Sequence, residues 1–136
     1  MSNPAYVKSE PGKWAREGVR EAELKDFISL SLESQRKVEE ILDEMENSQL
    51  VVFRYDGSDR LVAPFVVGVS SKGNPLMKGY QIEGGARSGK GKAWKVFKVG
   101  KMENLANFWD FFNGDEFDFD ESYPWIYKVF KMLEGG

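Results

Sequence analysis

"FRYDGSDRLVAPFVVGV", residues 53–69, places an Asp-Gly dipeptide at positions 56–57 between two segments rich in β-branched and aromatic residues. Asp and Gly tolerate the positive φ angles of a two-residue hairpin turn. The stretch therefore predicts two antiparallel strands, at about residues 50–55 and 60–69. Pro64 cannot donate a hydrogen bond to a sheet ladder, so we expect it at an edge, at a bulge or where pairing lapses.

Two further strands are expected downstream, "LMKGYQI" at 76–82 and "AWKVFKV" at 93–99. The last one alternates two faces, one with Trp94, Val96 and Lys98, the other with Lys95, Phe97 and Val99. If the core takes the face of Phe97, Trp94 and Lys98 point outward. If it takes the face of Val96, they point inward, and the alternation leaves both arrangements open.

The connection "GGARSGKG", residues 84–91, satisfies most of the phosphate-binding pattern G-x-x-x-x-G-K-[ST]. Gly91 stands where that pattern needs a magnesium-binding hydroxyl, and a strand is expected to follow instead of a helix. A hairpin loop is therefore favoured over a nucleotide-hydrolysing loop. Such a loop could still contact a phosphate through Ser88 and its backbone amides.

Three helices are predicted from apolar spacing. The first spans 31–48, begins at a Ser31 cap and carries an apolar face made of Val38, Ile41, Leu42 and Met45. The second, in "KMENLANFWDFF" at 101–112, groups Met102, Leu105, Phe108, Trp109 and Phe112 on one face. The third is a short helix in "PWIYKVFKMLEGG" at 124–136, with a proline in its first turn.

The fold class predicted from these elements is α+β, a small antiparallel β-barrel or curled sheet flanked by N- and C-terminal helices. A length of 136 residues corresponds to one domain. Its expected parts are an N-terminal arm (1–30), a helix packed on the barrel (31–48), the barrel with a following helix (49–113), and an acidic linker with a C-terminal helix (114–136).

The chain contains no cysteine and no histidine. This composition removes thiolate and imidazole zinc sites, cysteine nucleophiles and histidine acid–base chemistry. Carboxylate, lysine, tyrosine or serine chemistry would remain, with Glu83 as the plausible base of an enzyme, but no enzyme, metal or cofactor is expected. The acidic run "DEFDFDES", residues 115–122, lacks the spacing of a calcium loop and is interpreted as a solvated linker. No apolar run approaches the length of a membrane span, and we expect a soluble, cytoplasmic chain.

Charge is distributed unevenly along the sequence. Residues 60–101 carry nine basic residues and one acidic residue, whereas the remainder carries ten basic and twenty-one acidic residues. A local basic patch sets the field that an anionic ligand meets, whatever the net charge of −3. The segment from 60 to 101 is therefore the candidate anion-binding region.

The run "FRYDGSDRLVAPFVVGVSSKGNPLMKGYQ" at 53–81, followed by "WKVFKVGKMENL" at 94–105, resembles a WYL domain. Arg60 and Pro64 fit that family's arginine-x-x-x-proline step. Its closing strand, of the form R-x-F-R-x-D-R-I, is matched by Lys95, Phe97, Lys98, Lys101 and Met102. The Trp-Tyr-Leu signature is replaced by about 75–77, and lysines stand for the arginines, which keeps charge but loses the planar bidentate fork.

The resemblance implies an Sm-like small barrel that senses a ligand, with nucleic acid or nucleotide-type ligands held on a basic face. WYL domains usually follow a winged-helix DNA-binding domain, and the residues upstream of the matched segment here are too few and too irregular for one. A stand-alone protein of bacterial or phage type is therefore implied. The leading hypothesis is a non-enzymatic, regulatory module that captures a nucleic acid or a small phosphorylated nucleotide, cyclic ones included.

The residues proposed to bind this ligand combine cations, polar groups and aromatic rings. They are Arg60, Lys78, Tyr80, Gln81, Ser88, Trp94, Lys95, Lys98 and Lys101. Tyr80 and Trp94 are candidates for base stacking, although each is also a candidate for the core. The alternative hypothesis is a protein-interaction module, such as a phage-encoded inhibitor or regulatory subunit, that uses the acidic and aromatic part at 113–136; the oligomeric state is left open.

Overall fold

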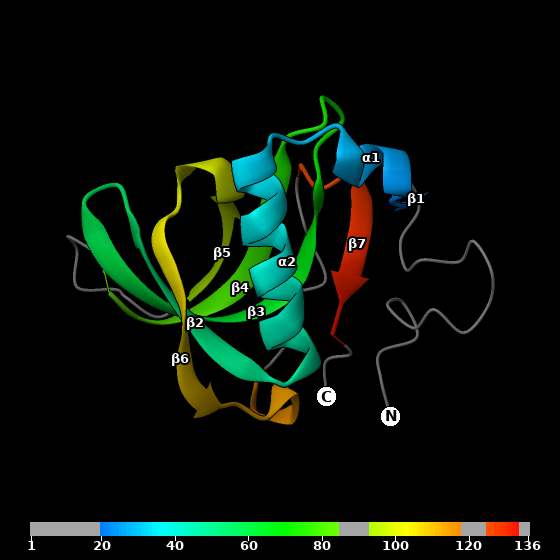
Figure 1. The fold of residues 1–136 in the computed structure, drawn as a ribbon. Coiled ribbons are helices and arrows are strands. Elements are labelled where there is room, and N and C mark those ends of the chain that lie inside the picture. The colour runs from blue at the N-terminus through cyan, green and yellow to red at the C-terminus, as the bar shows by residue number, and fades with distance from the viewer. Residues whose placement is uncertain (1–19, 85–92, 118–124, 134–136) are drawn as a thin grey trace.

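The computed structural model describes residues 20–84, 93–117 and 125–133 (Figure 1). These residues form an α+β fold with a mixed seven-stranded sheet. The elements, in chain order, are β1 (Arg20–Glu21), α1 (Leu24–Ile28), α2 (Leu32–Glu46), β2 (Gln49–Tyr55), β3 (Ser58–Val69), β4 (Pro75–Gly84), β5 (Ala93–Lys98), the 3₁₀ turn η1 (Val99–Lys101), β6 (Glu103–Phe111), the 3₁₀ turn η2 (Gly114–Glu116) and β7 (Lys128–Met132).

The sheet is curled but open. Its strands follow the order β1-β7-β3-β2-β6, and β4 with β5 branches from β3. Within the described residues, β5 at the end of the branch pairs with neither β6 nor β1 at the ends of the path, so the sheet does not close into a barrel. The curled sheet is therefore confirmed, and the Sm-like barrel stays a prediction.

The β2–β3 hairpin has the predicted turn. Tyr55 pairs with Ser58, and Asp56 and Gly57 between them have φ angles of 51° and 82°. Both residues are in the left-handed region, as a two-residue hairpin turn of this kind requires. The local sequence thus determines where the chain reverses.

A bulge interrupts the pairing of β3 with β4. Pro64 pairs with Gly79 and Val66 with Lys78, so Phe65 is an extra residue on β3. Of the three places expected for Pro64, an edge, a bulge or a lapse in pairing, the structure shows a bulge, at the residue that follows it. Pro64 lacks the amide hydrogen that a regular ladder would use. An extra residue also reverses the alternation of side chains along the strand.

Two apolar clusters lie on the two faces of the sheet. The first packs beneath α2, whose Val38, Ile41 and Met45 are fully buried, and it includes Val62 and Val67 of β3. The second contains Ala63, Phe65 and Val66 of β3, together with Phe112, Ile126, Val129 and Met132. Strand β3 therefore serves both clusters, with its bulge between them.

The helix predicted at 31–48 is confirmed as α2, which crosses one face of the sheet (Figure 1). The Ser31 hydroxyl accepts a hydrogen bond from the Ser34 amide at 3.1 Å, which is the expected N-cap. Asn47 follows its last turn.

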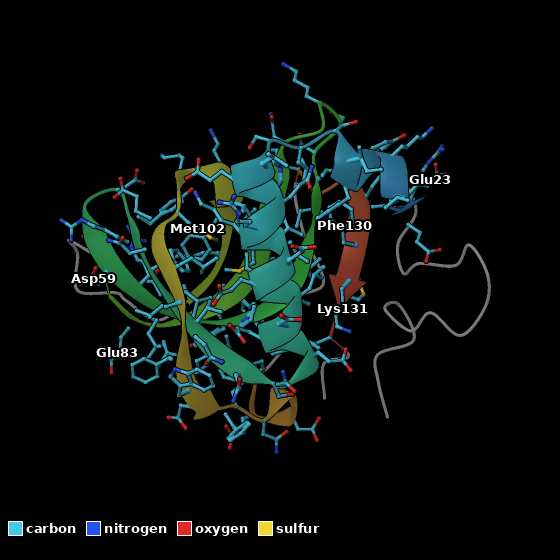
Figure 2. All side chains as sticks on the ribbon, viewed as in Figure 1. Glu23, Asp59, Glu83, Met102, Phe130 and Lys131 are labelled. Carbon is cyan, nitrogen blue, oxygen red and sulfur yellow. The ribbon has the colours of Figure 1, made fainter. Side chains whose placement is uncertain are left out.

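The helix predicted at 101–112 is wrong, because residues 103–111 form β6, which pairs with the free edge of β2. Met102 joins the first cluster and Phe112 the second, as Figure 2 illustrates for Met102 beside α2. A nine-residue strand spans roughly 30 Å, about twice the reach of a helix of equal length, and it connects these two distant anchors. Asn104 and Trp109, with φ angles of 56° and 65°, also depart from helical geometry.

The C-terminal helix predicted at 124–136 is also wrong where the structure describes the chain, since 128–132 form β7. This strand pairs antiparallel with β3 from Val66 to Val69, beyond the part of β3 that β2 covers, and parallel with β1. Phe130, labelled in Figure 2, lies on β7. Its ring packs edge-on against Phe27, with ring centroids 6.1 Å apart. Pairing with the open edge of β3 therefore outweighs the helical apolar pattern of this segment.

The strand that follows the glycine-rich stretch 84–91 is confirmed. Gln81 of β4 pairs with Ala93 of β5, so the stretch connects two antiparallel strands and not a strand and a helix. Residues 85–92 themselves lie outside the described residues. A separate finding is that no helix of the described chain is long and apolar enough to cross a bilayer.

A buried carboxyl group ties α2 to β6. The Asn107 amide donates to Glu44 at 3.1 Å and to Gln49 at 2.7 Å. Burial is the main cause that raises the pKa of Glu44 to about 7. A hydrogen bond with Glu40 and charge repulsion from Glu40 and Asp43 raise it further. The protonated form of this side chain is therefore the one that the fold favours.

We predict that Glu44→Gln removes a pH-dependent loss of stability. The pKa of this carboxyl rises from 4.5 in the unfolded chain to about 7 in the folded protein. The protonated carboxyl therefore stabilises the folded protein fully below pH 4.5, and this stabilisation is lost as the pH rises through 7. The free energy of unfolding of the variant should exceed that of the wild type by about 1–3 kcal/mol at pH 8, and the two should converge near pH 5. Urea unfolding across this range checks it, with exposed Glu39→Gln as the control; a constant offset would contradict the assignment.

Candidate functional site

An open groove of about 690 Å³ lies where the ends of several elements meet. The start of α2, the end of β2, the β3–β4 turn, β5 and η1 contribute to it. Its lining comprises Ser34, Tyr55, Ser70, Asn74, Pro75, Leu76, Val96, Lys98, Gly100, Lys101 and Trp125, which we call the candidate groove. Two residues predicted from the sequence, Lys98 and Lys101, are among them.

Tyr55 is held rigidly in the candidate groove. Its hydroxyl accepts a hydrogen bond from the Lys98 amide at 2.9 Å. Its ring packs edge-on against Phe97, with centroids 5.1 Å apart, and against Phe53 at 6.1 Å. The ring is therefore fixed before any ligand arrives, which lowers the entropic cost of binding.

Two cations lie near the ring of Tyr55. The Lys101 ammonium is 5.1 Å from the ring centroid and the Arg60 guanidinium carbon is 5.5 Å from it. Both distances are in the range of cation–π attraction. Together with the exposed side chain of Lys98, they make this end of the groove positive.

Lys101 also forms an ion pair with Asp56 of the hairpin turn, at 2.8 Å. The hydrogen bond to Lys101 lowers the pKa of Asp56, and the same bond raises the pKa of Lys101, so both groups are charged. The pair is open to solvent and contributes little to stability. An anionic ligand can therefore compete with Asp56 for this ammonium group.

A second hollow of about 810 Å³ adjoins the first through Gly100 and Lys101. It contains the carboxylates of Glu33, Asp56 and Glu103 beside Lys37 and Lys101. Because carboxylates outnumber lysines here, this hollow is less suited to an anion than the candidate groove.

Arg60 and Gln81 form a polar network inside the protein. The Arg60 guanidinium donates to the Gln81 side-chain oxygen and to the Tyr55 carbonyl, each at 3.1 Å. Gln81 in turn donates to the Gly84 carbonyl at 2.6 Å. The Arg60 Nε is buried and has no hydrogen-bond partner in the part of the chain that the structure describes. The network contacts Tyr55 through its carbonyl oxygen and through the Arg60 guanidinium beside its ring, and so helps to hold Tyr55 in place.

Four of the predicted binding residues lie away from the candidate groove. Lys78 and Gln81 have only 2% and 0% of their surface exposed, and the Lys78 ammonium is 5.6 Å from the centroid of Trp94. Tyr80 and Trp94 pack edge-on at 5.3 Å and both contact Phe117. These four side chains are parts of the interior or of an aromatic cluster.

The two arrangements left open for β5 are both partly realised. Phe97 and Val99 belong to the first cluster, and Trp94 and Val96 pack against the second. Each face of the strand is thus covered along part of its length, and Lys98 emerges at the end beside the groove. Lys95, opposite Gly79, is half-buried outside the groove lining, and Ser88 lies outside the described residues.

Sequence patterns alone missed several lining residues. Tyr55 is the last residue of β2, directly before the Asp-Gly turn. Its place beside that predicted turn could have identified it as a candidate binding residue. Ser70 accepts hydrogen bonds from the amides of Lys72 and Asn74, so it shapes the β3–β4 turn. Trp125, 73% exposed with a φ of 73°, offered no local signal.

Comparison with known proteins identifies no family. No family model matches the chain, and no curated protein does. Among solved structures, the chain is similar to proteasome accessory factor B/C (PafBC) of Arthrobacter aurescens, with 20% identity and a TM-score of 0.47. That similarity covers 57% of this chain and 12% of the other, so the chain spans a small part of that protein. The resemblance to a WYL domain remains a prediction from the sequence.

We predict that Arg60 contributes to stability and Lys98 does not. Arg60→Ala removes the hydrogen bonds that the guanidinium donates to the Gln81 side chain and to the Tyr55 carbonyl, and it should lower the free energy of unfolding by about 1–3 kcal/mol. Lys98→Ala, at an exposed position, should change it by less than about 0.5 kcal/mol. Urea unfolding of both variants checks this difference, and equal effects would show that the Arg60 network is not structural.

Proposed function

We propose that the chain is a non-enzymatic regulatory module that binds a phosphorylated nucleotide unit, free or within a nucleic acid strand, in the candidate groove. The observation that carries this proposal is the fixed ring of Tyr55 with Lys98 and Lys101 beside it. Cations next to aromatic rings are the combination that holds phosphates and bases in single-strand binders.

The phosphate would be held by the ammonium groups of Lys98 and Lys101. The Lys101 ammonium is near the Tyr55 ring, and the Lys98 backbone amide donates to the Tyr55 hydroxyl. Lys101 gains freedom to bind when it leaves Asp56. Lysine acts as a point charge on phosphate and selects no particular orientation. The geometry of binding would therefore come from the rest of the groove.

The base would lie along the apolar part of the groove. Pro75, Leu76 and Val96 provide an apolar wall, and the exposed ring of Trp125 is available for stacking. Ser34 and Asn74 can exchange hydrogen bonds with polar edges of the base or with a sugar hydroxyl. Stacking on an aromatic ring contributes about 1–3 kcal/mol per base.

Binding without catalysis is proposed because the groove lacks the groups that most often act as general acids or bases. The chain has no histidine or cysteine, and the described lining residues include no carboxylate. Tyr55, Lys98 and Lys101 are the titratable groups of the lining, and the proposal assigns the lysines to phosphate binding. Nucleotides and nucleic acids occur in the cytoplasm, where we expect the chain.

The proposal predicts salt-sensitive binding that depends on two lysines. A labelled single strand of DNA or RNA, a cyclic dinucleotide and ATP are titrated by fluorescence or calorimetry at 50 and 200 mM salt. Two phosphate contacts should weaken strand binding roughly sevenfold between these conditions. The double variant Lys98→Ala/Lys101→Ala should lose at least about tenfold in affinity.

Exposed Lys25 on α1 supplies the matched control, and Lys25→Ala should bind like the wild type. Binding of the strand alone would assign the ligand to nucleic acid, and binding of the small probes alone to a free nucleotide. The absence of binding to every probe at 50 mM salt would refute the proposal.

A second prediction concerns the competition between Asp56 and the ligand. Asp56→Asn removes the carboxylate that pairs with Lys101, so affinity for the phosphorylated probe should rise by about threefold. Asp59→Asn is the control, because Asp59 lies on the same hairpin but pairs with Arg54 at 3.6 Å. An equal gain in both variants would reflect net charge and not a specific competition.

A further inference from the structure

Strand β6 carries an aromatic protrusion that the proposed function does not use. Gln49 pairs with Phe111 and Val51 with Asn107, so four steps along β6 face only two along β2. Residues 108–110 therefore lie opposite Leu50 alone, and Trp109 has a φ of 65°. Phe108, Trp109 and Phe111 are 47%, 78% and 68% exposed, and we call these three residues the β6 protrusion.

The β6 protrusion is anchored firmly at its base. The Asn107 side chain accepts a hydrogen bond from the Trp109 amide at 2.6 Å while donating to Glu44 and Gln49. Phe112, directly after the protrusion, donates to the Ser48 carbonyl at 2.9 Å and packs in the second cluster. The exposed rings are thus presented from a fixed backbone, which reduces the entropy lost on binding a partner.

The protrusion is poorly suited to accept an added strand. The Trp109 amide is bound to Asn107, and the Phe111 amide is bound to its neighbour Asp110 at 2.9 Å. Strand addition relies on main-chain groups of a free edge, and side chains already occupy these donors. A partner would therefore contact the aromatic side chains themselves.

Charge around the protrusion indicates which partner fits. Residues 108–117 contain no basic residue and three acidic residues, Asp110, Asp115 and Glu116, all of which are exposed. Asp110 lies between Trp109 and Phe111, and η2, with two more carboxylates, follows β6 directly at the sheet edge (Figure 1). In a symmetric pair of these chains, two acidic rims would face each other and repel.

We propose that the β6 protrusion is a docking surface for a protein partner that offers an apolar pocket rimmed by lysine or arginine. Exposed tryptophan and phenylalanine side chains on a fixed support are typical of interface hot spots, and the surrounding carboxylates select a basic rim. The surface comes from β6, which lies outside the region 113–136 where an interaction was expected, and from η2, which lies inside it. It shares no residue with the candidate groove.

The test selects peptides with the full chain and needs no knowledge of the partner. A random peptide library displayed on phage is panned against the wild type and against Trp109→Ala. Peptides enriched by the wild type alone should combine lysine or arginine with aromatic or aliphatic residues. A synthetic peptide of that sequence should bind the wild type at least about tenfold more tightly than Trp109→Ala.

Two further variants separate apolar from electrostatic contributions. Asp110→Asn should weaken the same peptide by about twofold to fivefold and reduce its salt dependence. Leu24→Ala, at a residue equally exposed on α1, is the matched control and should bind like the wild type. Thermal unfolding of each variant verifies that the fold is retained.

Three outcomes would overturn the proposal. The first is the absence of enrichment over Trp109→Ala, and the second is enrichment of acidic or purely apolar peptides. The third is concentration-dependent self-association in sedimentation experiments that Trp109→Ala abolishes, which would assign the surface to a second copy of the chain. Basic–apolar peptides that depend on Trp109, with a monomeric chain, would support the proposal.

Discussion

The bulge at Phe65 is the constraint on which the rest of the structure depends. Side chains on a regular strand alternate, so β3 without an extra residue would place Ala63, Phe65 and Val67 on one face. The bulge instead gives Phe65 and Val66 to the second cluster and Val67 to the first. One strand can thereby support α2 on one face and the side chains of Phe112, Val129 and Met132 on the other.

The elements that the sequence predicted correctly are those determined by nearby residues. The Asp-Gly turn, the Ser31 cap and the alternation in 93–99 each act over a few positions. The two helices predicted at 101–112 and 124–136 failed because distant edges determine these segments. Residues 103–111 complete β2 and residues 128–132 complete β3, and neither edge is visible in a local apolar pattern.

The candidate groove was predictable only in part for a similar reason. The charge pattern singled out Lys98 and Lys101, which the structure places in the lining of the groove, and their role in binding stays a prediction. Lys78 and Gln81 were assigned to a surface because alternation identifies a polar face only when one side of a sheet is covered. Here both sides are packed, and the groove is completed by Tyr55 and Trp125, which are seventy positions apart in the sequence.

The pairing of β1 with β7 has a consequence for how the chain reaches its structure. Arg20 lies opposite Lys128 and Glu21 opposite Val129, so contacts of very long sequence separation join the two strands. During synthesis, the β2–β3 hairpin and α2 can assemble as soon as they leave the ribosome. In contrast, β1 and the part of β3 that pairs with β7 remain without their partner strand until β7 has been synthesised. Until residue 132 is available, the apolar surface of the second cluster is uncovered, and this interval is the one in which a nascent chain most needs protection from aggregation.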